Sequence, residues 1–204
     1  MVARALCLLL SSMVLAVAAA APVSADRLPG VPMAWGNNYI GQVGDGTLID
    51  RATPRVVLDM TEVTAVAAGS QHSVALKSDG TVWTWGDNQH GQLGDGTFFH
   101  YRNYPAQVVG QDAECALGPS QVIGAGGSHT LTGLTDSAAG RLLAWGRNDW
   151  GQLGDGTTTS APYPVYVSGL TDALALTGGD NHSLAVATAG QTKPVQRTAD
   201  TPIR

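Results

Sequence analysis

The sequence has little charge, few aromatic residues and almost no cysteine. Charged residues make up 13% of its 204 positions and aromatic residues 6%, whereas an ordinary soluble domain carries about 25% charged residues. Such low charge excludes a charged disordered chain. The formal net charge of −5 also argues against a general nucleic-acid binder, which needs a basic face to neutralise phosphates.

Long apolar runs are absent after the N-terminus. The run Ala5–Ala21 follows the basic Arg4 and precedes the small residues Val23-Ser24-Ala25, which is the layout of a secretory signal peptide. We therefore predict a signal peptide over residues 1–25 and an exported mature chain from Asp26. A membrane anchor is the alternative, but the run is short and no basic stop-transfer flank follows it.

Export has consequences for location and for the cysteines. We expect a secreted or extracellular protein without a membrane span, and the periplasm or the cell surface also fits. Of the two cysteines, Cys7 lies in the predicted signal peptide and Cys115 is left alone. Without an internal disulfide, the fold must be held by packing.

Glycine, in contrast, is abundant. It accounts for 26 residues, well above its usual share of about 7%. Because glycine costs up to about 1 kcal/mol per helical position relative to alanine, the composition disfavours long helices and predicts many turns.

One motif of thirteen residues occurs three times, at Trp35–Thr47, Trp85–Thr97 and Trp145–Thr157, the last two reading WGDNQHGQLGDGT and WGRNDWGQLGDGT. A second motif, Gly-x-x-His, also occurs three times. The tryptophans are 50 and then 60 residues apart, and the additional residues fall in the connections between motifs. We assign structural roles in the repeat to Trp35, Gly36, Asn38, Asp45, Gly46, His72, Trp85, Gly86, Asn88, Asp95, Gly96, His129, Trp145, Gly146, Asn148, Asp155, Gly156 and His182.

Each repeat contains four short apolar runs. In one unit these are Arg55–Leu58, Val63–Ala68, His72–Leu76 and Thr81–Trp85, with a tight hairpin signal at Ser78-Asp79-Gly80 between the last two. A period near 50 residues with four short strands is typical of a β-propeller. We therefore predict an all-β array of four-stranded blades that stack because a single blade cannot bury both of its faces.

These motifs resemble the regulator of chromosome condensation repeat family. The pattern WGxNxxGQLGDGT, followed by AAGxxHSxAL and DGxVWxWG, covers roughly Met33 to Val186. The resemblance implies a propeller, usually of seven blades, that binds macromolecules through loops on one face. The family includes an exchange factor for a nuclear GTPase, membrane-trafficking and ubiquitin-ligase modules, and exported bacterial proteins, which this chain resembles with only about three repeats.

The chain is too short for a full ring of blades. We expect one strand at Met33–Trp35, two full units and three strands ending near Val186, which make a partial propeller of about three blades over residues 26–190. A disordered tail is expected at residues 191–204. Since propellers usually have four to eight blades, we expect a partial ring, which would be an incomplete gene product, a fragment or a module that associates. Its open blade edges predict self-association.

The repeated polar residues are better explained by structure than by catalysis. Asp45, Asp95 and Asp155 offer one carboxylate per loop, whereas a calcium site needs six to eight oxygens; we predict that they stabilise turns. The three histidines recur in successive blades without a common focus, so we predict a hydrogen bond that holds each strand entry rather than zinc binding. The sequence lacks the motifs of nucleophilic catalysis and of nucleotide binding. We predict no catalytic residue, no metal site, no cofactor and no enzyme activity.

Candidate binding residues appear where the repeats differ. At one motif position the three units carry Ile40, His90 and Trp150, and an exposed tryptophan suggests a contact surface. The alternative is a tryptophan that folds onto the neighbouring loop.

A second candidate is a group of four aromatic residues after the GDGT motif of the second unit. They are Phe98, Phe99, Tyr101 and Tyr104. Aromatic residues dominate protein interfaces, although these rings could instead cover the edge of the incomplete array.

The sequence thus favours a non-enzymatic exported scaffold that binds a protein partner, as an inhibitor or a surface-interaction module. Three alternatives remain open. They are a guanine-nucleotide exchange factor-like regulator by family analogy, a truncated repeat protein without an independent function, and a propeller hydrolase or lyase. Nucleic acid is not expected as a partner.

Overall fold

The computed structural model describes residues 29–110, 117–135 and 141–187, and every regular element in these ranges is a β-strand. The all-β prediction is therefore confirmed. No helix long and apolar enough to cross a membrane occurs in these ranges. The predicted signal peptide, the C-terminal tail and Cys115 lie outside the described residues.

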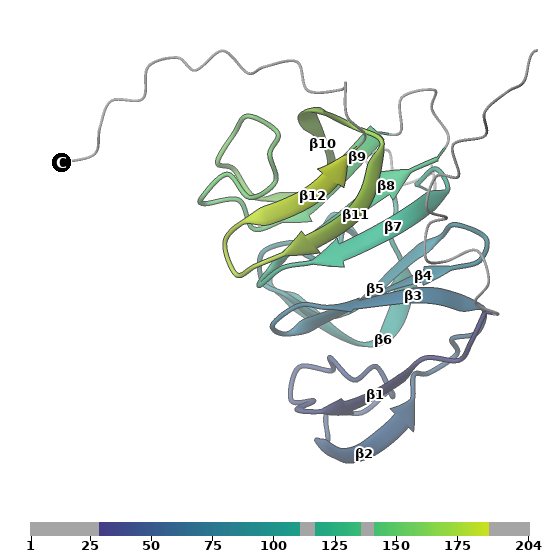
Figure 1. Ribbon diagram of the computed structural model, residues 1–204. Coiled ribbons are helices and arrows are strands. Elements are labelled where there is room, and N and C mark those ends of the chain that lie inside the picture. Colours follow the sequence, from purple (N-terminus) through teal and green to yellow (C-terminus); the bar gives the residue numbers. More distant parts are fainter. Residues whose placement is uncertain (1–28, 111–116, 136–140, 188–204) are drawn as a thin grey trace, which may run out of the picture.

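The strands form two full blades between two half-blades (Figure 1). The first full blade contains β3 (Val63–Ala68), β4 (His72–Lys77), β5 (Val82–Asn88) and β6 (His100–Gln107), in that order across the sheet. The second contains β7 (Ser120–Ala125), β8 (His129–Leu134), β9 (Arg141–Gly146) and β10 (Ala161–Thr171). The N-terminal half-blade consists of β1 (Met33–Gly36) and β2 (Arg51–Val56), and the C-terminal half-blade of β11 (Ala173–Gly178) and β12 (Ser183–Ala187).

The prediction of a partial propeller is confirmed, but the strands group differently from the expected units. The sequence places the run at Arg55 in the same unit as β3, whereas the structure pairs β2 with β1, with Arg55 opposite Ala34. The reason is the long loop after each tryptophan strand, which folds back and places the next strand beside it. The same arrangement joins β5 to β6 and β9 to β10.

The strands follow one order from the inner to the outer side of each blade. The loops after β3, β7 and β11 meet, because Ser70 N donates to Gly127 O (3.2 Å) and Gly127 N donates to Gly179 O (3.1 Å). Each inner strand also contacts the next inner strand along the chain, β3 with β7 and β7 with β11. The N-terminal half-blade therefore consists of outer strands alone, and the C-terminal half-blade of inner strands alone.

The hydrophobic core lies between blades. The largest cluster joins the two full blades and consists of Val74, Leu76, Val82, Val108, Ile123, Ala125, Leu134, Leu143 and Trp145. A second cluster, which includes Ala75 and Trp85, packs the first full blade against the N-terminal half-blade. A third, around Leu131 and Leu153, is partly covered by the C-terminal half-blade. Each blade thus depends on its neighbours for burial, as in other repeat proteins.

Candidate functional site: joints between blades and an aromatic edge

A buried asparagine organises the loop that follows each tryptophan strand. Asn148 Nδ2 donates to Asp155 Oδ1 (3.2 Å) and to Thr157 O (3.1 Å), and Asn148 Oδ1 accepts from Leu153 N (2.9 Å). Asn38 and Asn88 make the equivalent bonds in the other two units. All three side chains are fully buried, so the loops are rigid platforms of similar shape.

The repeated aspartates are occupied by these loops. Asp45 Oδ1 accepts from Thr47 N (3.0 Å) and Thr47 Oγ1 (2.7 Å), while Asp45 Oδ2 pairs with Arg51 Nε (2.6 Å). Burial alone would raise the pKa of the Asp45 carboxyl, but the bonds from Thr47 and Arg51 hold this pKa below its usual value. Within the described ranges, no group of three or more potential metal ligands occurs.

The tryptophans of the repeat form joints between neighbouring units. Trp85 and Trp145 are 3% and 0% exposed, and their Nε1 atoms donate to Gln42 O and Gln92 O, both at 2.9 Å. These carbonyls belong to the loop of the preceding unit. A Cβ at Gly44 would lie 2.5 Å from the Nε1 of Trp85, so glycine is needed there for the indole to fit.

Trp35 does not follow this pattern. The repeat predicts a core position, but its side chain is 63% exposed. The prediction is wrong because no loop of a preceding unit lies beside Trp35 among the described residues. Within the described ranges the joint is present twice, at Trp85 and Trp145, and half-formed at Trp35.

The histidines also connect neighbouring blades. His72 Nε2 lies 3.0 Å from Thr130 Oγ1, and His129 Nε2 lies 2.9 Å from Ser183 Oγ. The predicted hydrogen bond therefore exists but spans two blades instead of holding a strand entry. Burial, and secondarily the neighbouring His129, lowers the pKa of His72 to about 3. Burial, and secondarily His182, lowers the pKa of His129 to about 4.

Three of the candidate aromatic residues are exposed on or just before the outer strand of the first full blade. Phe99 is 81% exposed, and Tyr101 and Tyr104 are also exposed. We call Phe99, Tyr101 and Tyr104 the aromatic edge. Comparison of the repeats places the two tyrosines in the loop that leaves the GDGT turn, but they belong to β6. Phe98 is half-buried with its ring centroid 6.0 Å from that of Phe99.

The backbone of Phe99 is strained. Its φ is +63°, in the left-handed region that bulky residues seldom adopt. The Phe99 amide donates to Asn88 O (2.9 Å), which fixes this conformation. The second unit is one residue longer here than the others, so the strained Phe99 lies in the stretch that carries the additional residue.

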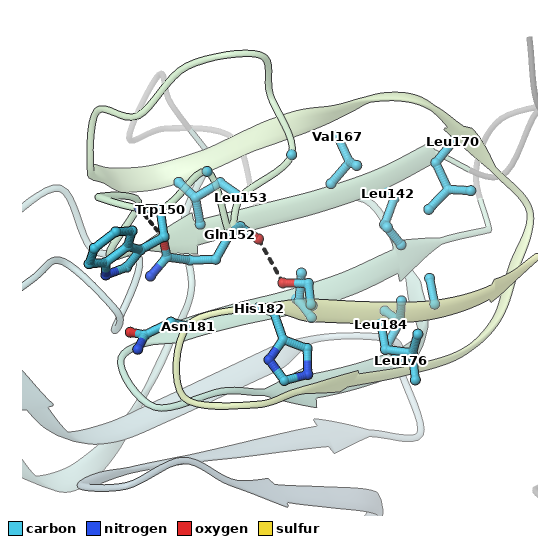
Figure 2. Close-up of a pocket in the computed structure, with 15 residues that line it drawn as sticks. Leu142, Trp150, Gln152, Leu153, Val167, Leu170, Leu176, Asn181, His182 and Leu184 are labelled. Atoms are coloured by element: carbon cyan, nitrogen blue, oxygen red, sulfur yellow. Dashed lines mark hydrogen bonds between the residues drawn. The ribbon is translucent and has the colours of Figure 1, made fainter. Parts of the chain in front are cut away.

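Trp150 lies in a different environment. It is exposed in the loop between β9 and β10, with its amide donating to Gln152 Oε1 (3.0 Å). Its side chain lines a groove beside the C-terminal half-blade (Figure 2). Sequence reasoning did not predict this groove, because the residues that line it are ordinary repeat positions that neighbouring blades cover elsewhere.

Family comparison agrees with the repeated joints. The sequence profile of the regulator of chromosome condensation (RCC1) repeat matches residues 34–76, 79–132 and 139–186. The chain belongs to the regulator of chromosome condensation repeat family. Its RCC1 repeats, as the profile delimits them, cross the blade boundaries, since each match contains strands of two successive sheets.

Similar proteins are mostly much longer than this chain. The human E3 ubiquitin-protein ligase HERC2 is 34% identical over 170 residues, which are 81% of this chain and 3% of HERC2. The ultraviolet-B receptor UVR8 of Arabidopsis thaliana is 28% identical over 171 residues, which are 82% of this chain and 37% of UVR8.

Solved structures show the same architecture. The crystal structure of Prp20p from Saccharomyces cerevisiae superimposes with a TM-score of 0.63 and 26% identity, covering 79% of this chain and 40% of Prp20p. Yeast RCC1 (Prp20) bound to Kap60 gives the same score over 78% of this chain and 38% of that chain. The RCC1 repeats here thus span at most about two fifths of the length of these relatives.

Proposed function

We propose that this chain is a non-enzymatic, exported scaffold that binds a protein partner through its aromatic edge. The observation that carries the proposal is the set of three exposed rings on and just before β6, beginning with Phe99 on a strained backbone. Exposed aromatic side chains provide a large contact area at a small entropic cost, and they dominate the energetics of protein interfaces. Backbone strain that nothing in the core requires is typical of functional positions.

The family supports a protein partner. The published structures of Prp20 concern its complex with Kap60 and its binding to Gsp1p and histones. In this chain the repeated polar side chains of the loops are engaged in hydrogen bonds within those loops. The aromatic edge is the feature that distinguishes the second unit from its neighbours, and it is therefore where we place recognition.

The test is a variant in which Phe99, Tyr101 and Tyr104 are all replaced by alanine. The immobilised wild-type chain is exposed to proteins secreted by the source cells, and retained proteins are identified by mass spectrometry. We expect the variant to lose at least one partner that the wild type retains. Far-UV circular dichroism should be unchanged, because these rings are exposed and contribute little to the core.

A matched control variant carries alanine at Leu48, Ile49 and Val56, which are exposed apolar residues of the first unit. It removes a similar number of exposed apolar side chains and should keep the partner. Equal retention by the wild type and the aromatic variant would contradict the proposal. Loss of the folded spectrum in the aromatic variant would show that the rings are structural.

A further inference from the structure

The joint between blades has three recurring parts. In both complete joints the tryptophan donates a hydrogen bond to a carbonyl of the preceding loop. The glycine after the tryptophan lies opposite the histidine in the strand ladder, and the next blade covers the inner strand. Gly86 lies opposite His72 in the β4–β5 ladder, and Gly146 lies opposite His129 in the β8–β9 ladder. The two half-blades each contain one side of a third joint.

The C-terminal half-blade has the receiving side. Gln42 O and Gln92 O each accept one bond from a hydroxyl and one from a tryptophan. Gln152 O accepts from Ser183 Oγ alone (2.6 Å) among the described residues, although a carbonyl oxygen has two lone pairs. Gly154, which corresponds to the glycines that admit Trp85 and Trp145, has no indole beside it.

These groups line the groove of about 400 Å³ shown in Figure 2. Its floor is apolar and includes Leu142, Leu153 and Leu176. Leu184 lies at its side and is 62% exposed, whereas the equivalent Val74 and Leu131 are buried. The outer edge of β12 has no strand paired to it among the described residues. The groove therefore lacks an outer strand that carries a tryptophan.

The N-terminal half-blade supplies the missing side. Trp35 is exposed and is followed by Gly36. A Cβ at Gly86 or Gly146 would lie 2.5 Å from the backbone oxygen of the residue just before the adjacent strand, but nothing lies within 4 Å of such a position at Gly36. Strand β1 thus presents a tryptophan side chain and a glycine that lets a neighbouring strand approach closely. The groove lacks both.

A second vacancy lies beside the N-terminal half-blade, which has no inner strands among the residues that the structure describes. Ile123 of β7 is buried in the cluster that joins the two full blades. The residue equivalent to Ile123 in β3 is Val66, which is exposed. A hollow of about 260 Å³ lies between β1 and the start of β4, lined by residues such as Trp35 and Ser70. This is the place that a pair of inner strands would fill.

We propose that two copies of this chain associate so that β1–β2 of each copy completes the blade begun by β11–β12 of the other. By the register of β4–β5 and β8–β9, His182 lies opposite Gly36 of the second copy, and Trp35 of that copy donates to Gln152 O. Two copies together contribute four full blades and two composite blades. The resulting ring of six blades is within the usual range of four to eight. By the same count one copy would give three blades and three copies nine, both outside that range.

Mixed disulfide formation tests the strand register. Ala34 and Leu184 would be directly opposite across copies, as Thr84 and Val74 are within one copy. Their Cα atoms would then lie within the range that a disulfide bridges. One sample carries Ala34→Cys and the other Leu184→Cys, both with Cys115→Ser, and they are mixed under mild oxidation. The control pair combines Ala34→Cys with Leu174→Cys, which is exposed on β11.

We expect the first pair to form a disulfide-linked dimer and the control pair to form none. Light scattering should give twice the mass of the chain for the wild type. Trp35→Ala should give the mass of one chain with an unchanged circular dichroism spectrum, whereas Phe99→Ala, an exposed aromatic outside the joint, should remain dimeric. A wild-type chain that stays monomeric, an open series of larger assemblies, or a dimer that survives Trp35→Ala would overturn the proposal.

Discussion

His72 lies between the two full blades, fully buried, with a pKa lowered to about 3 from its ordinary value of 6.5. In the unfolded chain the imidazole regains its ordinary pKa and binds a proton at a higher pH than in the fold. Between these two values the unfolded state therefore holds more protons, and the free energy of unfolding rises with pH. The stabilisation is fully present above about pH 6.5 and is lost as the pH falls towards 3.

This predicts a pH-dependent stability that replacement of the histidine reduces. For each buried histidine, the free energy of unfolding should fall by the order of 1 kcal/mol per pH unit below pH 6.5. His72→Gln, measured by urea denaturation at pH 7 and pH 5, should lose part of this dependence, and His129 should account for the remainder. His100→Gln removes an exposed imidazole and is the matched control. A slope unchanged by His72→Gln would contradict the assignment.

At the scale of single elements, the sequence predicted strand positions better than strand partners. The runs at Val63–Ala68 and His72–Leu76 became β3 and β4, and the hairpin at Ser78–Gly80 joins β4 to β5. The grouping of β2 was wrong, because apolar alternation shows that a segment is a strand but not which neighbour it pairs with. That choice is made by the hydrogen bonds inside the loop, which depend on several residues at once.

The loop asparagines provide a test at this scale. Asn88 is fully buried and bonds several backbone groups, including Leu93 N and Thr97 O, and an unsatisfied buried polar group costs about 1–3 kcal/mol. Asn88→Ala should therefore lower the free energy of unfolding by roughly 3 kcal/mol, measured by urea denaturation. Gln89→Ala, at the exposed neighbouring position, should change it by less than about 0.5 kcal/mol. Similar values for the two variants would show that the loop does not depend on this side chain.

At the scale of the whole molecule, the repeat predicted the propeller architecture and the small number of blades. The described residues form two full blades and two half-blades, as expected of a partial propeller. The exposure of Trp35 and the groove around Gln152 could not be predicted, because their sequence motifs match those of buried joints. A joint is buried where a neighbouring blade covers it and exposed where no blade does. The local sequence motif does not show whether that blade is present. The division of the chain into complementary half-blades becomes visible only when the sheet order is known.

Association through composite blades also predicts how the whole molecule melts. When the folded form gains stability from a second copy, mass action raises the unfolding temperature as the protein concentration increases. The wild type should therefore melt at a higher temperature at 100 µM than at 1 µM. A hundredfold change in protein concentration corresponds to about 2.7 kcal/mol in the free energy of unfolding. Trp35→Ala should melt at the same temperature at both concentrations, since it lacks the indole that fills the groove. A concentration-independent melt in the wild type would mean that its exposed half-blades are stable without a neighbour.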